Sequence, residues 1–346
     1  MPRRHTPSLR VAGAICVLYV CLGSLGSGAT LEFVPIGHAG NPPDSTGFGS
    51  VSYEYAISKY EVTNAVYAEF LNLVDPTAAN ARGLYSSEMS AQPDGGILLI
   101  QGAANGSKYA VKPGYGSEPA TNMDFFSVAR FMNWLHNGQG IGDTETGAYT
   151  MSLGFSVPRN GGARFWIPSQ SEWYKAAYYQ PASVGGDTDG YWRYPTRSNA
   201  IPNSRPGNNF DANSANFFRD DGSPDDSLND GFAKGPGDPN STNLLTDVGA
   251  YSAAPSFYGT FDQGGNVREW VDAIGPVGGQ RGLWRGGTAV DFEDVLSASY
   301  SPLSPRPPGS RFTGIRIGAT LVAVPEPTSG AMIAASVCLL SLRRIP

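Results

Sequence analysis

The chain has 346 residues, of which 44 are Gly and 27 are Pro, so about a fifth of its positions favour turns, and a long helical bundle or coiled coil is excluded. Charged residues make up 16% and hydrophobic residues 40%, a balance that excludes a disordered chain. The net charge of −6 argues against nucleic acid as a partner, because its phosphates need a basic surface, and we expect a folded, loop-rich domain.

Residues 1–29 have the three parts of a secretory signal peptide. Arginines open the segment, an apolar stretch follows over 11–25, and small residues end it at Ala29. We predict that signal peptidase cleaves after Ala29. An uncleaved membrane anchor is the alternative, and it is disfavoured because the apolar stretch is short and interrupted by Gly and Ser.

The first half of the remaining chain predicts two strands and two helices. Apolar residues alternate over 31–36 and 53–57, as in half-buried strands. Thr63 and Asp124 are good N-caps, and each precedes a segment with apolar residues at helical spacing. Residues 76–121 are rich in small residues and predict an excursion that contains a short hairpin.

The second half begins with a capping box, in which Ser169 and Glu172 mark the start of a third helix. Residues 181–246 have no periodicity, which points to a structured functional loop or to bound ions. The acidic cluster within that stretch, from Asp220 to Asp230, fits no EF-hand, and a solvated loop is the likelier reading. Short strands are expected within 281–322, and we find no linker that divides residues 31–322.

Cysteine and histidine are too scarce for several kinds of site. The cysteines are Cys16, Cys21 and Cys338, so residues 31–322 contain none. Disulfides, thiolate nucleophiles and cysteine-ligated metals are therefore excluded there. His38 and His136 lie about 100 residues apart, so a three-histidine metal site is excluded, and no G-x-S-x-G elbow supports a Ser-His-Asp triad.

Six sequence blocks together resemble the formylglycine-generating enzyme, or sulfatase-modifying factor, family. They occur in the order of that family and cover about 35–320: Lys59-Tyr60-Glu61-Val62-Thr63-Asn64, Ala129-Arg130-Phe131-Met132-Asn133-Trp134-Leu135, Arg164-Phe165-Trp166-Ile167-Pro168-Ser169-Gln170-Ser171-Glu172-Trp173, Gly264-Gly265-Asn266-Val267-Arg268-Glu269-Trp270, Arg285-Gly286-Gly287-Thr288 and Gly314-Ile315-Arg316. The resemblance implies an α+β fold related to C-type lectins, as a single domain rich in irregular structure over residues 31–322.

The catalytic chemistry of that family does not carry over to this chain. Formylglycine-generating members use two cysteines after the Arg-Gly-Gly block to bind copper, and those places fall on Asp291 and Leu296. Neither side chain supplies a thiolate ligand. Related enzymes need a histidine set for iron, which the histidine count excludes, so we expect neither copper nor iron.

Structural calcium does carry over from the resemblance, because Ca²⁺ prefers carboxylate and carbonyl oxygens. The implied ligands are the side chains of Asp262 and Glu269 and the carbonyls of Gly265 and Val267, with an ordinary turn as the alternative. The resemblance implies a second calcium site at Asn216 and the Phe217 carbonyl, with Asn243 and the Leu245 carbonyl as weaker candidates.

Residues 324–346 resemble the PEP-CTERM sorting signal of bacteria that assemble extracellular polysaccharide. The triplet Pro325, Glu326 and Pro327 precedes a short apolar run and a terminal pair of arginines. The apolar run is too short to span a bilayer, which needs about 20 residues. In that family an exosortase cuts near the triplet, so we expect an exported protein, transiently anchored in the membrane, at the cell surface or outside the cell.

Two further groups of residues suggest a ligand. Tyr191, Trp192 and Tyr194 could stack on sugar rings, although buried aromatic packing is the commoner alternative. The acids Asp291, Glu293 and Asp294 stand where the family's active site begins, and a polar loop is an equal alternative.

Two functions remain open at this point. The first is a non-catalytic domain that binds a ligand outside the cell, with polysaccharide as the first guess. The second is a divergent oxidoreductase or hydrolase that uses Asp291 and its acidic neighbours.

Overall fold

The computed structural model describes residues 18–20, 31–154, 157–204, 211–220, 231–234, 240–274, 281–301 and 311–323. Most of the predicted signal peptide, the C-terminal signal with Pro325, Glu326 and Pro327, and most of the acidic cluster lie outside these residues.

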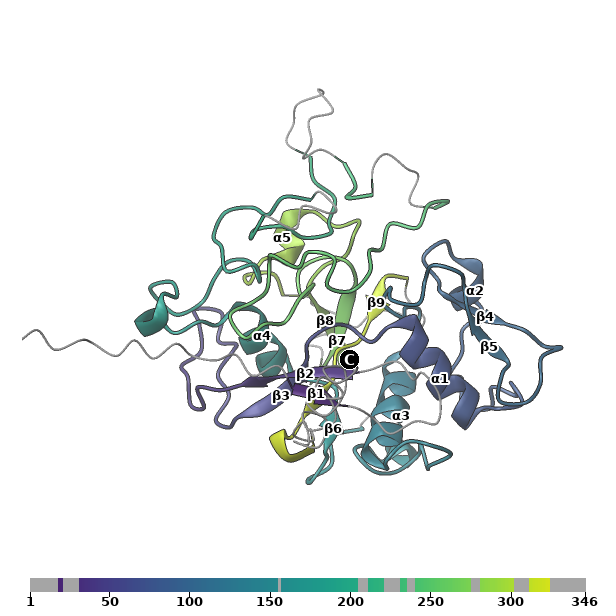
Figure 1. Cartoon of the computed structure of the whole chain (residues 1–346). Helices are drawn as coiled ribbons and strands as arrows, with labels where there is room; N and C mark the ends of the chain where they lie inside the picture. The colour runs from purple at the N-terminus through teal and green to yellow at the C-terminus, as the bar shows by residue number, and fades with distance from the viewer. Residues whose placement is uncertain are drawn as a thin grey trace, which may run out of the picture.

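Helices α1 (Asn64–Val74) and α3 (Phe125–His136) lie beside each other on one side of the molecule (Figure 1). Both begin as predicted, because the side chains of Thr63 and Asp124 each accept a hydrogen bond from an amide of the first turn. Their apolar faces meet where Phe70 of α1 packs edge-to-face on Phe131 of α3, with ring centroids 5.2 Å apart.

Helix α4 (Gln170–Tyr178) lies on the opposite side (Figure 1), and the predicted capping box is present at its start. The Ser169 hydroxyl accepts a hydrogen bond from the Glu172 amide at 3.2 Å, and the Glu172 carboxylate accepts one from the Ser169 amide at 2.6 Å. Seven of the nine residues of α4 are buried, so the helix forms part of the core.

A five-stranded antiparallel sheet lies between these helices, with the order β1-β2-β3-β10-β6. The C-terminal strand β10 is inserted between two earlier strands, which ties both ends of the domain together. The strands are β1 (Leu18–Val20), β2 (Leu31–Ile36), β3 (Tyr55–Ser58), β6 (Phe165–Trp166) and β10 (Gly318–Ala319).

A second sheet, of three strands, contains Glu269 and Trp270. Its central strand β7 (Arg268–Ile274) is antiparallel to β8 (Arg281–Arg285) and parallel to β9 (Thr313–Gly314). Most of the stretch 181–267 that leads into β7 is irregular, and its only element among the described residues is one short 3-10 helix.

The predicted excursion 76–121 contains the expected hairpin, and also a short helix that the sequence did not reveal. The small elements of the fold are α2 (Glu88–Ala91), β4 (Ile97–Leu99), β5 (Tyr109–Val111), α5 (Glu293–Leu296) and three single-turn 3-10 helices, Met151–Leu153, Ala182–Val184 and Leu321–Ala323.

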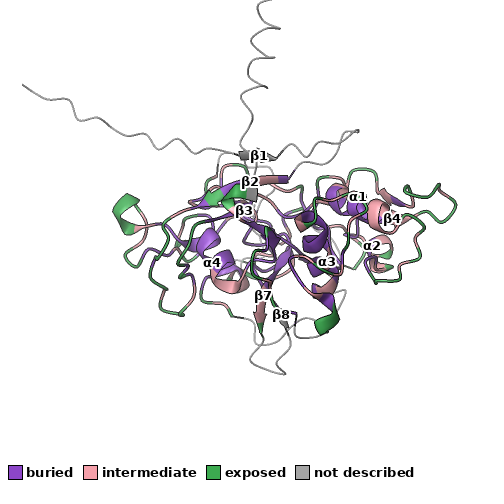
Figure 2. Cartoon of the chain, turned by 90° about the horizontal axis from the view of Figure 1, so that it is seen from below, coloured by how far each residue is buried: buried purple, intermediate pink, exposed green. Residues whose placement is uncertain are grey.

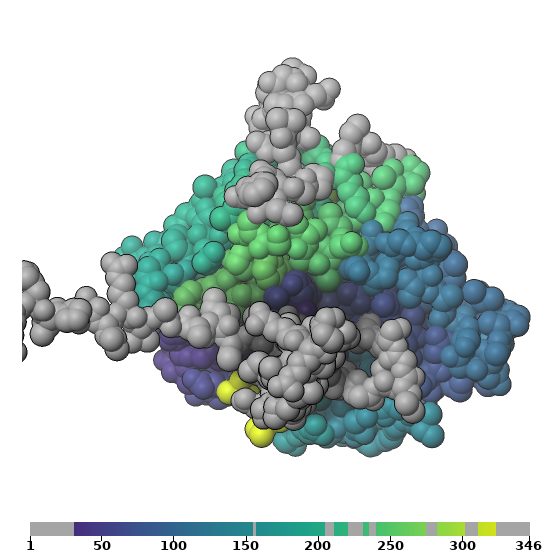
Figure 3. Space-filling model, viewed as in Figure 1, coloured from purple at the N-terminus to yellow at the C-terminus, as the bar shows by residue number. Residues whose placement is uncertain are grey.

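Buried residues gather between the helices and the sheets, whereas exposed residues concentrate in the outer loops (Figure 2). In the space-filling view the irregular residues, drawn teal to green, cover the upper part of the molecule, and the excursion 76–121 projects at the right (Figure 3). No helix among the described residues is long and apolar enough to cross a membrane.

Candidate functional site

The turn before β7 brings the predicted calcium ligands Asp262 and Glu269 into the core. Asp262 has a φ of 61° and Gly265 one of 88°, so the chain doubles back tightly at both residues. Gly265 has no room for a side chain, because a Cβ there would lie 2.1 Å from the Asn216 carbonyl oxygen. The turn is therefore held directly against the irregular segment that contains Asn216.

Glu269 is bound by protein donors on both carboxylate oxygens. Arg316 donates to it from Nε and Nη2 at 2.9 to 3.1 Å, and the Trp173 indole donates at 2.6 Å. Both Glu269 and Arg316 are fully buried. Arg316 also donates to the Ser58 and Phe261 carbonyls, so this ion pair joins the strands, α4 and the turn.

The surroundings of this ion pair hold more negative than positive charge. Glu61 is buried and Asp262 is half-buried near Glu269, and Arg316 is the cation that attracts all three. Burial raises the pKa of Asp262 to about 6, and the charge of Glu269 acts in the same direction. Burial and the neighbouring Asp262 raise the pKa of Glu61 well above its usual range. The Oε2 atom of Glu61 has no hydrogen-bond partner among the described residues.

Asn266 connects this acidic region to the second group of predicted ligands. Its Nδ2 donates to Glu61 Oε1 at 3.2 Å, and its Oδ1 accepts from Asn216 Nδ2 and the Thr246 amide, each at 3.0 Å. Asn216 also donates to the Leu244 carbonyl at 3.0 Å. These bonds hold the segments around 216, 245 and 266 together.

The second predicted calcium site retains unused acceptors. The Oδ1 atom of Asn216 is buried and accepts no hydrogen bond from the described residues. Within that part of the chain the carbonyls of Phe217 and Leu245 accept none either. Amide and carbonyl oxygens are the kinds of ligand that Ca²⁺ prefers. Asn243 fits less well, because its amide already donates to both oxygens of Glu118 and its Oδ1 accepts from the Leu245 amide.

The first predicted calcium site has the negative charge that a cation needs, but one of its predicted ligands already accepts hydrogen bonds from protein donors. A divalent cation near Asp262 would offset the excess of carboxylates, whereas Glu269 is already occupied by Arg316 and Trp173. Among the described residues no three acidic, histidine or cysteine side chains come together to hold a metal ion. A cation at either site would therefore depend on backbone carbonyls and amide oxygens.

The two positions that match the family's cysteines are filled by structural side chains. Asp291 accepts a hydrogen bond from the Thr288 hydroxyl at 2.9 Å, within its own loop. Leu296 is fully buried in an apolar cluster with Tyr194, Ala215 and Phe217. It packs so closely that a Cβ on Gly287 would lie 2.7 Å from its Cδ1.

The other predicted ligand residues divide between surface and core. Glu293 and Asp294 occupy the first turn of α5 near the surface, and within the described part of the chain no hydrogen bond joins them to Asp291. Tyr191 and Tyr194 are 5% and 0% exposed, so a sugar-stacking role for them is wrong, and buried packing is confirmed. Trp192 is half-buried and donates to Gln180 at 3.0 Å.

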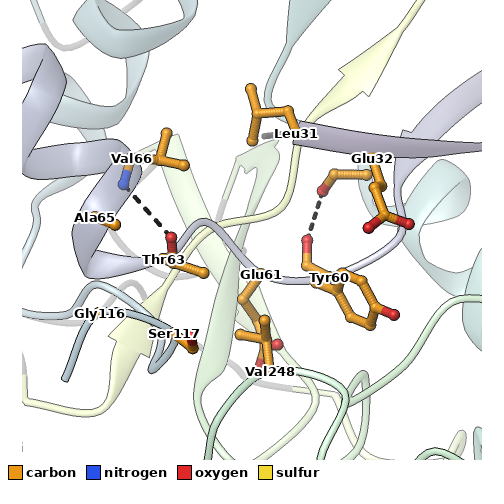
Figure 4. A pocket seen from close by; sticks show the side chains of 11 residues that line it. Leu31, Glu32, Tyr60, Glu61, Thr63, Ala65, Val66, Gly116, Ser117 and Val248 are labelled. Carbon is orange, nitrogen blue, oxygen red and sulfur yellow. Dashed lines mark hydrogen bonds between the residues drawn. The ribbon is translucent and has the colours of Figure 1, made fainter. Parts of the chain in front are cut away.

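A hollow of about 420 Å³ lies between β2 and the start of α1 (Figure 4). Its lining includes Glu32, Tyr60, Glu61 and Val248, with the Thr63 cap at one wall. None of the predicted ligand residues contributes to it.

Three residues of this region were missing from the predicted site, namely Glu61, Asn266 and Arg316. Each stands inside a block that resembles the family, so the blocks were the available signal. The contact of Glu61 with Asn266 spans 205 positions of sequence and that of Arg316 with Glu269 spans 47, and no local pattern shows either.

A family profile and several solved structures are similar to this chain. The family profile described as "Sulfatase-modifying factor enzyme 1-like domain" matches residues 42–317. The comparison with curated proteins gives no significant match.

Three solved structures are similar to this chain at low sequence identity. A structure titled "Crystal Structure of CarF" superposes with a TM-score of 0.50 and 19% identity, covering 84% of this chain and 98% of the other. Treponema denticola variable protein 1 superposes with a TM-score of 0.46 and 16% identity, covering 88% of this chain and 99% of the other. PvdO from Pseudomonas aeruginosa superposes with a TM-score of 0.41 and 18% identity, covering 84% of this chain and 94% of the other. At these identities the CarF likeness shows the fold alone.

Proposed function

Because the chain belongs to the family of sulfatase-modifying factor enzyme 1-like domains, we propose that it is an exported, non-catalytic member that binds polysaccharide at the cell surface or outside the cell. Signal peptidase and an exosortase would process its two ends. The fold is the family's, but function depends on the site that a fold carries, and here that site has changed.

Leu296 is the observation that carries this proposal. A copper thiolate centre needs two cysteine sulfurs, and residues 31–322 contain no cysteine. The position of the second cysteine holds a leucine that is 0% exposed and packed among apolar side chains. The surrounding residues have thus adapted to an apolar side chain, which supports a domain retained for binding instead of oxidation.

Calcium is the cation that we assign to this domain, in a structural role. At one site Asn216 Oδ1 and the carbonyls of Phe217 and Leu245 would hold it, and at the other Asp262 with the carbonyls of Gly265 and Val267. Calcium would supply positive charge and fix irregular backbone that hydrophobic burial does not hold.

The binding role is tested by retention of the purified protein on immobilised polysaccharides, with and without a chelator. We expect saturable binding to at least one polysaccharide, and weaker binding after chelation because the irregular segments loosen. A protein that is retained on none of them would contradict the proposal.

A further inference from the structure

A surface groove of about 530 Å³ lies at the edge of the five-stranded sheet, away from the predicted ligand residues. It is lined by Tyr53 and Glu54 before β3, by residues 159–163 and Trp166, and by residues 320–322 after β10. Figure 3 shows the yellow C-terminal residues against the purple N-terminal ones at the lower left. Its volume falls within the range of roughly 300–1,000 Å³ that is usual for ligand sites.

Tyr53 presents an exposed aromatic ring in this groove. The side chain is 41% exposed, although a tyrosine next to a strand commonly packs inward. Its hydroxyl donates to Glu172 at 2.6 Å and accepts from Arg159 at 3.0 Å. The ring is therefore held in one orientation before any ligand arrives, which lowers the entropy cost of binding.

The positive charge of Arg159 in the groove is already compensated. Arg159 donates to both oxygens of the buried Glu172, at 2.9 and 3.3 Å, and its guanidinium lies 4.6 Å from the centre of the Trp166 ring. The Trp166 indole donates to the same carboxylate at 3.1 Å. Little positive charge remains for an anionic ligand, and the net charge of −6 repels one further.

We infer that this groove binds an uncharged polysaccharide, with one sugar ring stacked on Tyr53. A pyranose has an apolar face of C–H groups that packs on an aromatic ring, and hydroxyls around its edge that need polar partners. Glu54 and the backbone of Gly161 and Gly162 are exposed at the rim and offer such partners. The inference rests on the proposed binding function and assigns it to a place.

The glycines of the groove allow a substitution that narrows it without disturbing the fold. A Cβ at Gly161 meets no atom within 4 Å, and its backbone does not adopt a positive φ. Because Gly161 lines the groove, the bulky indole of Gly161→Trp would stand at its wall and narrow it. Gly102 has the same open surroundings and backbone but lies outside the groove, so Gly102→Trp is the matched control.

The experiment measures the affinity of the full chain for neutral glucan, mannan and galactan and for acidic alginate and polygalacturonate. We expect the parent to bind a neutral polysaccharide. Gly161→Trp and Tyr53→Ala should weaken that binding about tenfold or more. Tyr53→Phe keeps the ring but loses the hydroxyl that fixes its orientation, so it should bind more weakly than the parent and more tightly than Tyr53→Ala. Gly102→Trp should bind like the parent. Thermal melting of each variant separates loss of binding from loss of fold.

Three other results would overturn the inference. If the parent binds and Gly161→Trp binds equally well, the groove is wrong while the binding function stands. A preference of the parent for alginate or polygalacturonate contradicts an uncharged ligand. If the parent binds none of the five polysaccharides, both the groove and the proposed function fail.

Discussion

Arg316 is the residue on which the charge balance of the core depends. It forms an ion pair with Glu269 at 2.9 Å, and its charge also acts on Glu61 and Asp262. Removal of one acid leaves Arg316 with two others, whereas removal of Arg316 leaves the buried Glu61 and Glu269 and the half-buried Asp262 without this cation. Loss of Arg316 should therefore cost more stability than loss of Glu269.

We expect Arg316→Met to destabilise the protein more than Glu269→Gln does. Removing one partner of a buried ion pair costs about 3–5 kcal/mol, and Arg316→Met should reach this range. Urea unfolding of both variants measures the difference. Equal losses would mean that Arg316 serves Glu269 alone.

Lys175 is a buried amine in α4 whose Nζ donates to the His38 carbonyl at 2.9 Å. Burial lowers its pKa from 10.5 to about 8. The unfolded chain therefore binds more protons than the native one between these two values, and stability rises with pH in that window. Below about pH 8 the cost of the buried charge is present in full.

Lys175→Met removes this titration while keeping the length of the side chain. We expect the stability of the parent relative to Lys175→Met to increase between about pH 7 and pH 10, because the parent loses its buried charge. Denaturant unfolding of both proteins across that range gives the difference directly. A difference that does not change with pH would contradict the lowered pKa.

At the scale of the elements, helices were predicted more reliably than strands. Thr63, Asp124 and the Ser169–Glu172 pair are local signals, because a cap and its partner lie within three residues. The strands β9 and β10 have two residues each, and partners 45 or more positions away decide their pairing. Helix α2 was not predicted for a different reason: its four residues are too few to show a periodicity.

The irregular stretch 181–267 is the element whose order we ascribe to calcium. When the free calcium concentration is 100 times the dissociation constant of a site, binding there adds about 2.7 kcal/mol of stability. We expect a chelator to lower the melting temperature of the parent. Asn216→Ala and Asp262→Asn should each respond less to the chelator than the parent does, because the first removes a proposed ligand and the second removes the negative charge of another.

Glu269→Gln is the control for this calcium experiment. Its carboxylate is held by Arg316 and Trp173, so the variant should melt lower than the parent and still respond to the chelator. If the chelator leaves the parent unchanged, neither calcium site is correct, and hydrogen bonds such as those of Asn216 and Asn266 hold the segment without a cation.

At the scale of the whole molecule, the six blocks predicted the fold and family correctly, but not the arrangement of the site. The importance of Glu61, Asn266 and Arg316 arises from long-range burial and charge, and the exposure of Tyr53 arises from the position of Glu172. Sequence patterns report periodicity and spacing, whereas these contacts exist only after folding.

The two ends of the chain should both be removed during export. We expect mass spectrometry of the mature protein to find a new N-terminus near Thr30 and loss of the segment after Pro327. Cleavage after Ala29 would also remove β1 and leave β2 paired with β3 alone. A full-length product in the cytoplasm would contradict the proposed export.

The central claim is that this family member has lost the family's oxidation chemistry, and a peptide assay tests it most directly. The purified protein is incubated with a Cys-x-Pro-x-Arg peptide, copper and oxygen, beside a family member that carries both cysteines. We predict that the peptide keeps its thiol with this protein, because Asp291 and Leu296 supply no thiolate to copper. Formation of the formylglycine aldehyde by this protein would contradict the claim.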